Sequence, residues 1–208
     1  MTKIILSLLT FCIALLFSCG NSKTNTTEFQ NGDIIFQTSE SQQCEAVRIA
    51  TNSKFSHCGI IFIENGKTYV YEAVQPVKIT PFESWISHGR DSKYVVKRLK
   101  KSGTQLSEEQ LSEMKKYGEK MLDKNYDIYF GWSNSEIYCS ELVWKIYKNG
   151  ANIELCNTKE LKDFNLDNPI VQRIMYQRYG TQVPLHEKVV APSQLHESEL
   201  LETVYDNY

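Results

Sequence analysis

The chain has 208 residues and a formal net charge of −2, from 23 Lys and Arg against 25 Asp and Glu. This length suits one domain with its own hydrophobic core. Because acidic and basic residues are interspersed, the charge pattern points neither to nucleic acid nor to an anionic membrane surface as a partner.

The first eighteen residues differ in composition from the rest of the chain. Lys3 precedes an almost wholly apolar run over residues 4–17, which is typical of a secretory signal and short for a transmembrane helix. The run ends in Leu16-Phe17-Ser18-Cys19, which resembles the processing site of bacterial lipoproteins. In that class the signal is cut before the Cys, and the Cys is lipidated. An ordinary signal peptide with an incidental Cys is the alternative.

These features predict three segments and a location. We expect a lipoprotein signal peptide over residues 1–18, a lipidated Cys19 with a flexible polar tether over 19–30, and one folded domain over 31–208. The protein is then anchored to a bacterial membrane through Cys19 and lies in the cell envelope, on the extracytoplasmic side. The sequence indicates neither which membrane face carries the anchor nor the oligomeric state.

The domain opens with a turn and then shows a strong hairpin pattern. Residues 34–37 predict a short strand, and a polar stretch with an apolar thread over 39–53 predicts a short helix. Two apolar runs, His57–Ile63 and Thr68–Val74, then flank Asn65-Gly66. Asn-Gly between two such runs is the strongest local indication of a β-hairpin.

The hairpin register follows from the two-residue loop. Glu64 pairs with Lys67, so Glu72 lies opposite Gly59 and shares a sheet face with His57. His57 and Glu72 become diagonal neighbours, roughly 7–8 Å apart between Cα atoms, and Gly59 offers no side chain to separate them. The residues alone therefore predict an imidazole–carboxylate pair.

The remaining elements lie on either side of Cys139. Residues 94–99 predict a strand, and Ser107 begins a charged helix that runs to about Leu122. Residues 158–178 predict helical pieces around Pro169, and residues 189–195 an extended segment that leads into a final short helix.

Cys139 is expected to begin an amphipathic helix. Leu142, Val143, Ile146 and Tyr147 follow it at helical spacing, Asn134 or Ser135 is placed to cap the helix, and Gly150 is expected to end it in a left-handed conformation. A thiol in the first turn lies near unpaired N–H groups and the positive end of the helix dipole, which favour the thiolate. A buried structural cysteine is the alternative.

Four cysteines besides Cys19 remain in the domain. Cys44, Cys58, Cys139 and Cys156 match no disulfide framework and no zinc motif, so we expect no metal and no other cofactor. Whether Cys44, Cys58 and Cys156 form disulfides stays open. Cys58, next to His57 but on the opposite strand face, is interpreted as a packing residue.

Cys139, His57 and Glu72 have the residue types of a nucleophile, a base and an orienting group. A thiol nucleophile needs a base within hydrogen-bond reach, and the base needs a third group to orient it. The other histidines are poorer bases, because His88 lies in a predicted loop and His186 and His196 lie in polar C-terminal surroundings.

Five motifs stand out along the domain: Asn31–Phe36, Phe55–Ile60, Tyr71–Ala73, Tyr138–Val143 and Ala191–Leu195. Together they resemble the YiiX-like branch of the circularly permuted papain-like hydrolases, relatives of the NlpC-type cell-wall amidases. The resemblance spans residues 31 to about 200 and implies an α+β papain-like fold, with a helix-start nucleophile packed on a small barrel or sheet that carries the His. It implies Cys139 as nucleophile, His57 as base and Glu72 as the third polar residue.

The resemblance also implies a tyrosine upstream of the Cys that helps to form the oxyanion site. Tyr126 is the nearest match by spacing, with Tyr129 and Tyr138 as alternatives. An equally open interpretation is that Tyr126 only packs in the core or lines the groove.

The expected function is hydrolysis of an amide in the cell envelope by a Cys-His-Glu triad, and the expected partner is a small peptide or lipid substrate. Residues 100–135 and 150–188 are rich in Lys, Asp, Glu and Asn, which predicts polar groove walls and favours a cell-wall peptide. The alternatives are a lipid acyl hydrolase or acyltransferase on the same fold, which the resemblance also allows, and a lipoprotein that binds a ligand without turnover.

Overall fold

The computed structural model describes residues 28–100 and 105–208. The expected signal peptide, Cys19 and most of the expected tether lie outside the described residues. Within the two described ranges, no helix is both long enough and apolar enough to span a bilayer.

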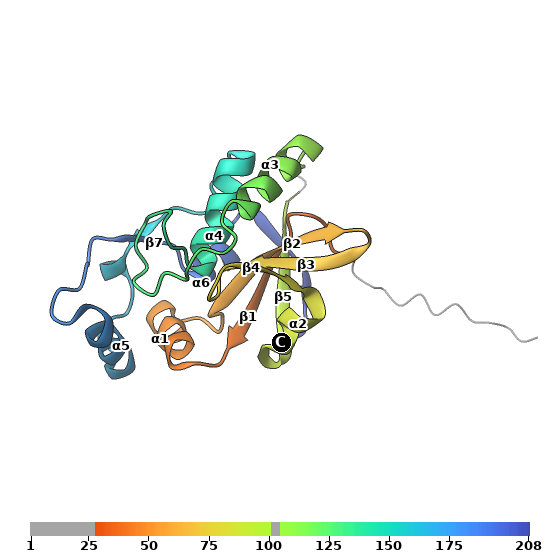
Figure 1. Ribbon diagram of the computed structural model, residues 1–208. Helices are drawn as coiled ribbons and strands as arrows, with labels where there is room; N and C mark the ends of the chain where they lie inside the picture. The colour runs from red at the N-terminus through yellow and green to blue at the C-terminus, as the bar shows by residue number, and fades with distance from the viewer. Residues whose placement is uncertain (1–27, 101–104) are drawn as a thin grey trace, which may run out of the picture.

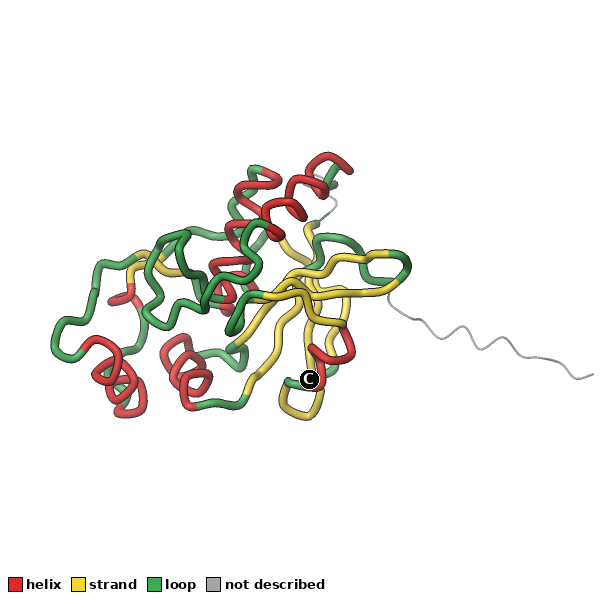
Figure 2. The backbone as a smooth tube through the Cα atoms, viewed as in Figure 1, coloured by secondary structure: helices red, strands yellow, loops and turns green. Residues whose placement is uncertain are grey.

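An antiparallel six-stranded sheet forms the centre of the domain, with strand order β4-β3-β2-β1-β5-β8 (Figure 1). Helices flank it, and a two-stranded sheet of β6 and β7 lies apart from it. The architecture is the expected α+β class (Figure 2). The strands are β1 (Ile34–Ser39), β2 (His57–Glu64), β3 (Lys67–Glu72), β4 (Lys78–Pro81), β5 (Gly89–Leu99), β6 (Lys159–Glu160), β7 (Lys188–Val189) and β8 (Leu201–Asp206).

The helices lie on both faces of the sheet and beside it. Helices α3 and α4 cover one face, whereas α1 and α5 pack together at the side of the domain (Figure 1). The helices are α1 (Gln42–Thr51), α2 (Phe82–Ser87), α3 (Glu108–Glu119), α4 (Cys139–Ile146), the π-helix η1 (Tyr147–Ala151), the 3₁₀-helix η2 (Leu161–Asp163), α5 (Pro169–Tyr179) and α6 (Pro192–His196).

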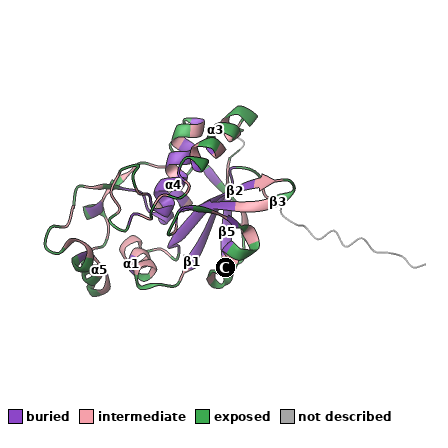
Figure 3. Cartoon of the chain, viewed as in Figure 1, coloured by how far each residue is buried: buried purple, intermediate pink, exposed green. Residues whose placement is uncertain are grey.

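Alternation along β2 builds two hydrophobic clusters, one on each face of the sheet. Cys58 and Ile60 belong to the larger cluster, which includes Leu142 of α4, whereas Ile61 packs with Trp85 of α2. Side chains on successive strand residues point to opposite faces, so one strand serves both clusters. Burial is densest where the sheet meets α4 (Figure 3).

The β2–β3 hairpin has the predicted register. Ile60 pairs with Tyr71 and Glu64 with Lys67, and Asn65 and Gly66 both take positive φ, as a tight two-residue loop requires. Gly59 is needed here, because a Cβ atom at this position would lie 2.4 Å from Val70 Cγ1. The hairpin can therefore be placed from the sequence because its turn fixes its pairing.

The Cys139 helix begins where the sequence predicts, but its predicted cap and its predicted end are wrong. Neither Asn134 nor Ser135 caps it; Tyr138 precedes the helix, and Glu141 Oε2 accepts from the Tyr138 backbone N–H at 3.3 Å. Helix α4 continues into η1 and ends at Asn152, which takes φ 57°. Gly150 lies inside η1 against α3, where a Cβ atom would come within 2.4 Å of Met114 Cα. The glycine permits close helix packing and does not end the helix.

Candidate active site

The structure brings His57, Glu72 and Cys139 together from three elements. His57 begins β2, Glu72 ends β3 and Cys139 begins α4, and all three side chains are buried. The His57 Nε2 atom lies 2.7 Å from Glu72 Oε2, the contact that the hairpin register predicts. Thr80 of β4 donates to the other carboxylate oxygen, Oε1, at 2.6 Å. Both oxygens of Glu72 are thus fixed.

Cys139 and Glu72 together favour the cationic form of His57. Because Nε2 is engaged by Glu72, Nδ1 is the ring nitrogen left for the thiol. Burial disfavours the charged ring, but the hydrogen bonds and negative charges of Cys139 and Glu72 together raise the His57 pKa to about 10. Burial likewise opposes ionisation of Glu72, but His57, Thr80 and Lys78 together outweigh it and lower the Glu72 pKa, so Glu72 is a carboxylate.

Cys139 is held as the thiolate partner of this cation. The hydrogen bond from the Cys58 thiol lowers the Cys139 pKa most; burial opposes it, and the hydrogen bond and charge of His57 lower it further. The net Cys139 pKa lies well below its usual range. A thiolate paired with an imidazolium is the resting state of an activated cysteine nucleophile.

Cys58 is a site residue whose contact with Cys139 the sequence-based interpretation missed. It does pack in the core, in the same cluster as Cys139, and its thiol is the largest cause of the lowered Cys139 pKa. Burial raises the pKa of Cys58 well above its usual range, so it remains a thiol that donates. Strand alternation in the sequence could have predicted this contact. Cys58 lies on the same strand face as Ile60, and α4 packs on that face.

Trp85 supports the far face of the His57 ring. The two ring centroids lie 5.7 Å apart and the rings are inclined by 22°. Trp85 is fully buried in α2, a helix that the sequence pattern did not predict. The imidazole is therefore fixed by Glu72 at its edge and by Trp85 at its face.

Tyr126 is the tyrosine best placed to donate a hydrogen bond near Cys139. Its hydroxyl accepts from Gln43 Nε2 at 3.0 Å, and Gln43 Oε1 accepts from Arg178 Nη2 at 2.6 Å. Because Arg only donates, it fixes which end of the Gln43 amide faces Tyr126. The Tyr126 hydroxyl thus accepts from Gln43 and keeps its own hydrogen to donate.

The two alternative tyrosines serve other contacts. Tyr129 is half exposed, and its backbone carbonyl accepts from the Tyr179 hydroxyl. The Tyr138 hydroxyl accepts from the Val190 backbone N–H at 3.1 Å, which ties the segment before α6 to the start of α4.

Burial raises the pKa of Tyr126 well above its usual range, so Tyr126 stays a neutral donor.

A pocket of about 90 Å³, open to solvent, leads to Cys139, and its wall is predominantly apolar. The prediction of polar groove walls is therefore wrong. Apart from Arg178, the charged residues of the 150–188 segment lie outside the pocket wall, while apolar side chains of the segment turn inward. From this segment, the pocket is lined by Leu161, Phe164, Leu166, Val171, Ile174, Met175 and Arg178; α1 contributes Gln43, Ala46, Val47, Ala50 and Thr51.

Comparison with known proteins places this geometry in a family. Residues 28–205 match the sequence model of a protein family. That family is described as permuted papain-like amidase, YaeF/YiiX, C92. The chain belongs to this family. It is 44% identical over 175 residues to the uncharacterised protein YiiX of Escherichia coli K12, covering 84% of this chain and 85% of YiiX.

A solved structure agrees with the family assignment. The crystal structure of a protein described as metalloprotein yiiX from Escherichia coli O157:H7 has a TM-score of 0.81 at 44% identity, and the match covers 86% of this chain and 98% of that one. At the family level, the chain is thus a papain-like amidase or peptidase-type hydrolase with the permuted order, His57 before Cys139.

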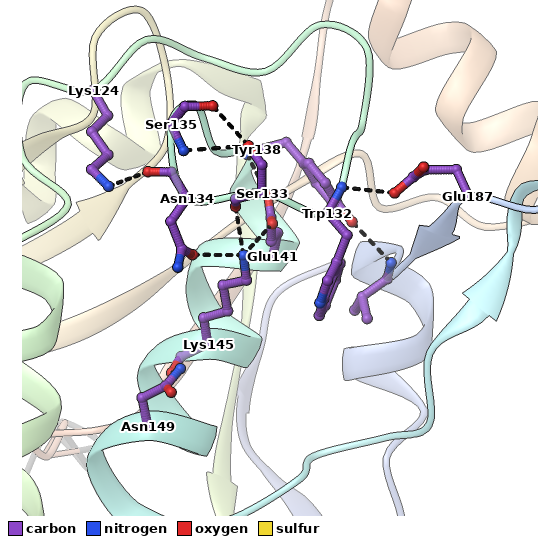
Figure 4. A network of polar contacts seen from close by, with 11 residues as sticks. Lys124, Trp132, Ser133, Asn134, Ser135, Tyr138, Glu141, Lys145, Asn149 and Glu187 are labelled. Carbon is purple, nitrogen blue, oxygen red and sulfur yellow. Dashed lines mark hydrogen bonds and ion pairs between the residues drawn. The ribbon is translucent and has the colours of Figure 1, made fainter. Parts of the chain in front are cut away.

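In this papain-like hydrolase, a buried ion pair lies on α4, the helix that begins at Cys139. Lys145 Nζ lies 2.7 Å from Glu141 Oε1, and both side chains are buried on α4. Lys145 also donates to Ser133 O at 2.6 Å and to Asn134 Oδ1 at 2.9 Å (Figure 4). Burial raises the Glu141 pKa to about 7, although Lys145 opposes this. The network ties the loop before Cys139 to α4.

The other histidines lie away from the candidate site formed by Cys139, His57 and Glu72. His88 is exposed at the end of α2, and His186 is exposed beside Glu160 at 2.9 Å. His196 packs against Phe55 with ring centroids 4.4 Å apart, and burial lowers its pKa to about 4. Over residues 28–100 and 105–208, no three or more His, Cys, Asp or Glu side chains cluster as a metal site would require.

Proposed function

We propose that this protein is a cysteine amidase in which Cys139, His57 and Glu72 cleave an amide whose acyl group is apolar. The observation that carries the proposal is the apolar pocket that opens onto Cys139 beside the His57–Glu72 pair. Ligand pockets combine an apolar wall with a few convergent polar groups, and here those groups are the nucleophile and its partners.

The proposed reaction has two halves, each using His57 once. The Cys139 thiolate attacks the amide carbonyl, and Tyr126 donates to the oxyanion that forms. The protonated His57 gives its proton to the amide nitrogen; the C–N bond breaks, the amine leaves, and a thioester remains on Cys139. Neutral His57 then takes a proton from water, the hydroxide attacks the thioester, and the acid leaves as the thiolate and imidazolium are restored.

The pocket wall favours an acyl chain over a cell-wall peptide as the group held beside Cys139. Leu166, Val171 and Met175 offer no partner for the amines and carboxylates of a stem peptide, and burying such groups unpaired is costly. Transfer of the acyl group to an acceptor other than water would use the same thioester. The metal in the description of the E. coli protein has no counterpart in the proposed mechanism.

We also propose that the protein acts as an envelope lipoprotein, with its pocket held near the bilayer. The support is the Leu16–Cys19 processing pattern and a tether of about eleven residues, which reaches at most roughly 40 Å. Acyl-chain substrates are most abundant at that surface. Cys19→Ser should shift the protein from the membrane to the soluble envelope fraction; membrane retention by this variant would remove the lipid-anchor proposal.

The amidase proposal is tested with N-dodecanoyl amides and stem-peptide fragments offered in parallel to the wild type and to Cys139→Ala. We expect free dodecanoate and amine from the wild type alone. Binding of the acyl amide with no turnover in either protein would instead support the ligand-binding alternative. Thiol-dependent cleavage of the stem peptides alone would overturn the acyl assignment.

Tyr126→Phe should lower kcat by roughly 10²–10³-fold, the usual loss for one oxyanion donor. The thiolate and its base remain, so alkylation of Cys139 by iodoacetamide should keep its wild-type rate at pH 6. Tyr129→Phe is the matched control and should leave kcat unchanged. A Tyr126→Phe enzyme with wild-type kcat would remove Tyr126 from the oxyanion site.

Glu72→Gln should move the basic limb of the pH–rate profile to lower pH. The His57 pKa is raised, to about 10, partly by the Glu72 charge, so the imidazolium is present below that pH and lost above it. A Gln at position 72 can turn its side-chain oxygen toward His57 and its NH₂ group toward Thr80. This keeps the orientation of the His57 ring but removes the negative charge. An unshifted basic limb in the kcat/KM profile would show that Glu72 does not set the charge of His57.

A further inference from the structure

Arg178 is the charged side chain in the wall of an otherwise apolar pocket. It lies in the last turn of α5 and lines the pocket with Tyr126 and Cys139. Among the lining residues there is no Lys, Asp or Glu and no other Arg. An ionised group half-withdrawn from water at this point needs a partner.

The protein uses only part of the hydrogen-bonding capacity of Arg178. One Nη2 hydrogen goes to Gln43 Oε1 at 2.6 Å, and the guanidinium packs over the Phe130 ring at 5.1 Å from its centroid. Within the described residues no carboxylate lies within 4.0 Å of it, and no second acceptor is hydrogen-bonded to it. Asp127 contributes only a more distant charge, and burial lowers the Arg178 pKa.

The unused N–H donors of Arg178 lie close to Tyr126 and Cys139. Gln43 is the single residue between Arg178 and Tyr126, through hydrogen bonds of 2.6 and 3.0 Å. Tyr126 in turn lines the pocket beside Cys139. An anionic group on Arg178 would therefore belong to a part of the substrate close to the scissile bond, and not to the far end of an acyl chain.

Resting on the proposed amidase function, we propose that Arg178 binds a substrate carboxylate next to the scissile amide. The planar guanidinium presents paired N–H donors that match the two oxygens of a carboxylate. Gln43 and Phe130 hold it in place before the substrate arrives. The substrate class is then an amide that joins an apolar acyl chain to an amine bearing a carboxylate.

A different role for Arg178 predicts a different result. If Arg178 only orients Gln43, and through it Tyr126, its loss lowers the rate of every amide by the same factor. If it binds a carboxylate, its loss affects acidic substrates and spares neutral ones. The ratio of kcat/KM between an acid and its neutral isostere separates the two roles.

The experiment compares N-dodecanoylglycine with N-dodecanoylglycinamide. The wild type should prefer the acid, and Arg178→Gln should reduce that preference by roughly 10- to 100-fold, the range for hydrogen bonds to charged groups. Arg173→Gln, an exposed Arg on the same helix, should keep the wild-type ratio. Equal losses on both substrates would overturn the carboxylate site.

A binding measurement separates this proposal from the amidase proposal. In the Cys139→Ala background, calorimetry should show tighter binding of the acid than of the glycinamide, and Arg178→Gln should abolish the difference. Equal affinities in the Cys139→Ala protein would overturn the Arg178 assignment. Absence of thiol-dependent turnover alongside a clear Arg178-dependent affinity difference would overturn the amidase proposal and leave the carboxylate site standing.

Discussion

His57→Ala should lower kcat/KM by about 10⁴-fold, the upper end for loss of a general acid–base. The loss is large because, in the proposed mechanism, this one ring holds the thiolate, protonates the leaving amine and activates the water. Without its positive charge, Cys139 keeps the hydrogen bond from Cys58 but loses its ion-pair partner, so its pKa should rise toward the usual range. Steady-state kinetics on an N-dodecanoyl amide measures the effect.

The matched control for His57→Ala is His88→Ala. His88 is exposed at the end of α2 and touches none of the three site residues, so its loss should leave kcat/KM unchanged. Urea unfolding of His57→Ala checks that the fold survives. A folded His57→Ala protein with more than a tenth of the wild-type rate would contradict the role of His57.

Lys145→Met should destabilise the domain by about 3–5 kcal/mol, the range for removing one partner of a buried ion pair. The methionine fills similar space but leaves Glu141 without its counter-charge, and Glu141 is fully buried. It also removes the donors to Ser133 O and Asn134 Oδ1, which tie the loop to α4. Urea unfolding followed by circular dichroism gives the free energy of unfolding.

Two variants test the cause of that destabilisation. Lys116→Met removes an exposed pair with Glu113 on α3, and it should cost less than about 1 kcal/mol. The double variant Glu141→Gln/Lys145→Met removes both charges and should be more stable than Lys145→Met alone. If Lys145→Met cost no more than Lys116→Met, the buried pair would not be what anchors α4.

Sequence reasoning succeeded where the geometry is local. The Asn65-Gly66 turn fixes the pairing of β2 with β3, and that pairing alone brings His57 and Glu72 into contact. The amphipathic pattern from Cys139 places this residue in the first turn of α4, on its buried side. Neither inference needs a contact between elements that are distant in the chain.

The rest of the site depends on packing between distant elements. Trp85 reaches the His57 ring from α2, and the Gln43–Tyr126 hydrogen bond joins α1 to a loop 83 residues further on. Gly150 looks like a helix end by its residue type, but its role is set by the approach of Met114 from α3. The residue pattern within one segment cannot predict such contacts between distant elements.

The pocket wall shows why composition misled the choice of substrate. Helix α5 has exposed Gln172 and Arg173 on one side and buried Val171 and Met175 on the other. Counting charges over residues 150–188 averages these two sides, although the helical period separates them. Only the structure shows that the apolar side of α5 faces α1 and Cys139.

The alkylation rate of Cys139 as a function of pH tests the thiolate–imidazolium pair most directly, because it needs no substrate. The folded protein is treated with iodoacetamide between pH 4 and pH 10, and each cysteine is followed by peptide mapping. At pH 6 Cys139 should react faster than Cys44 and than Cys156, whose pKa burial raises to about 12, and His57→Ala should reduce that advantage. A Cys139 that reacts at pH 6 no faster than Cys44 and Cys156 would contradict its assignment as the nucleophile.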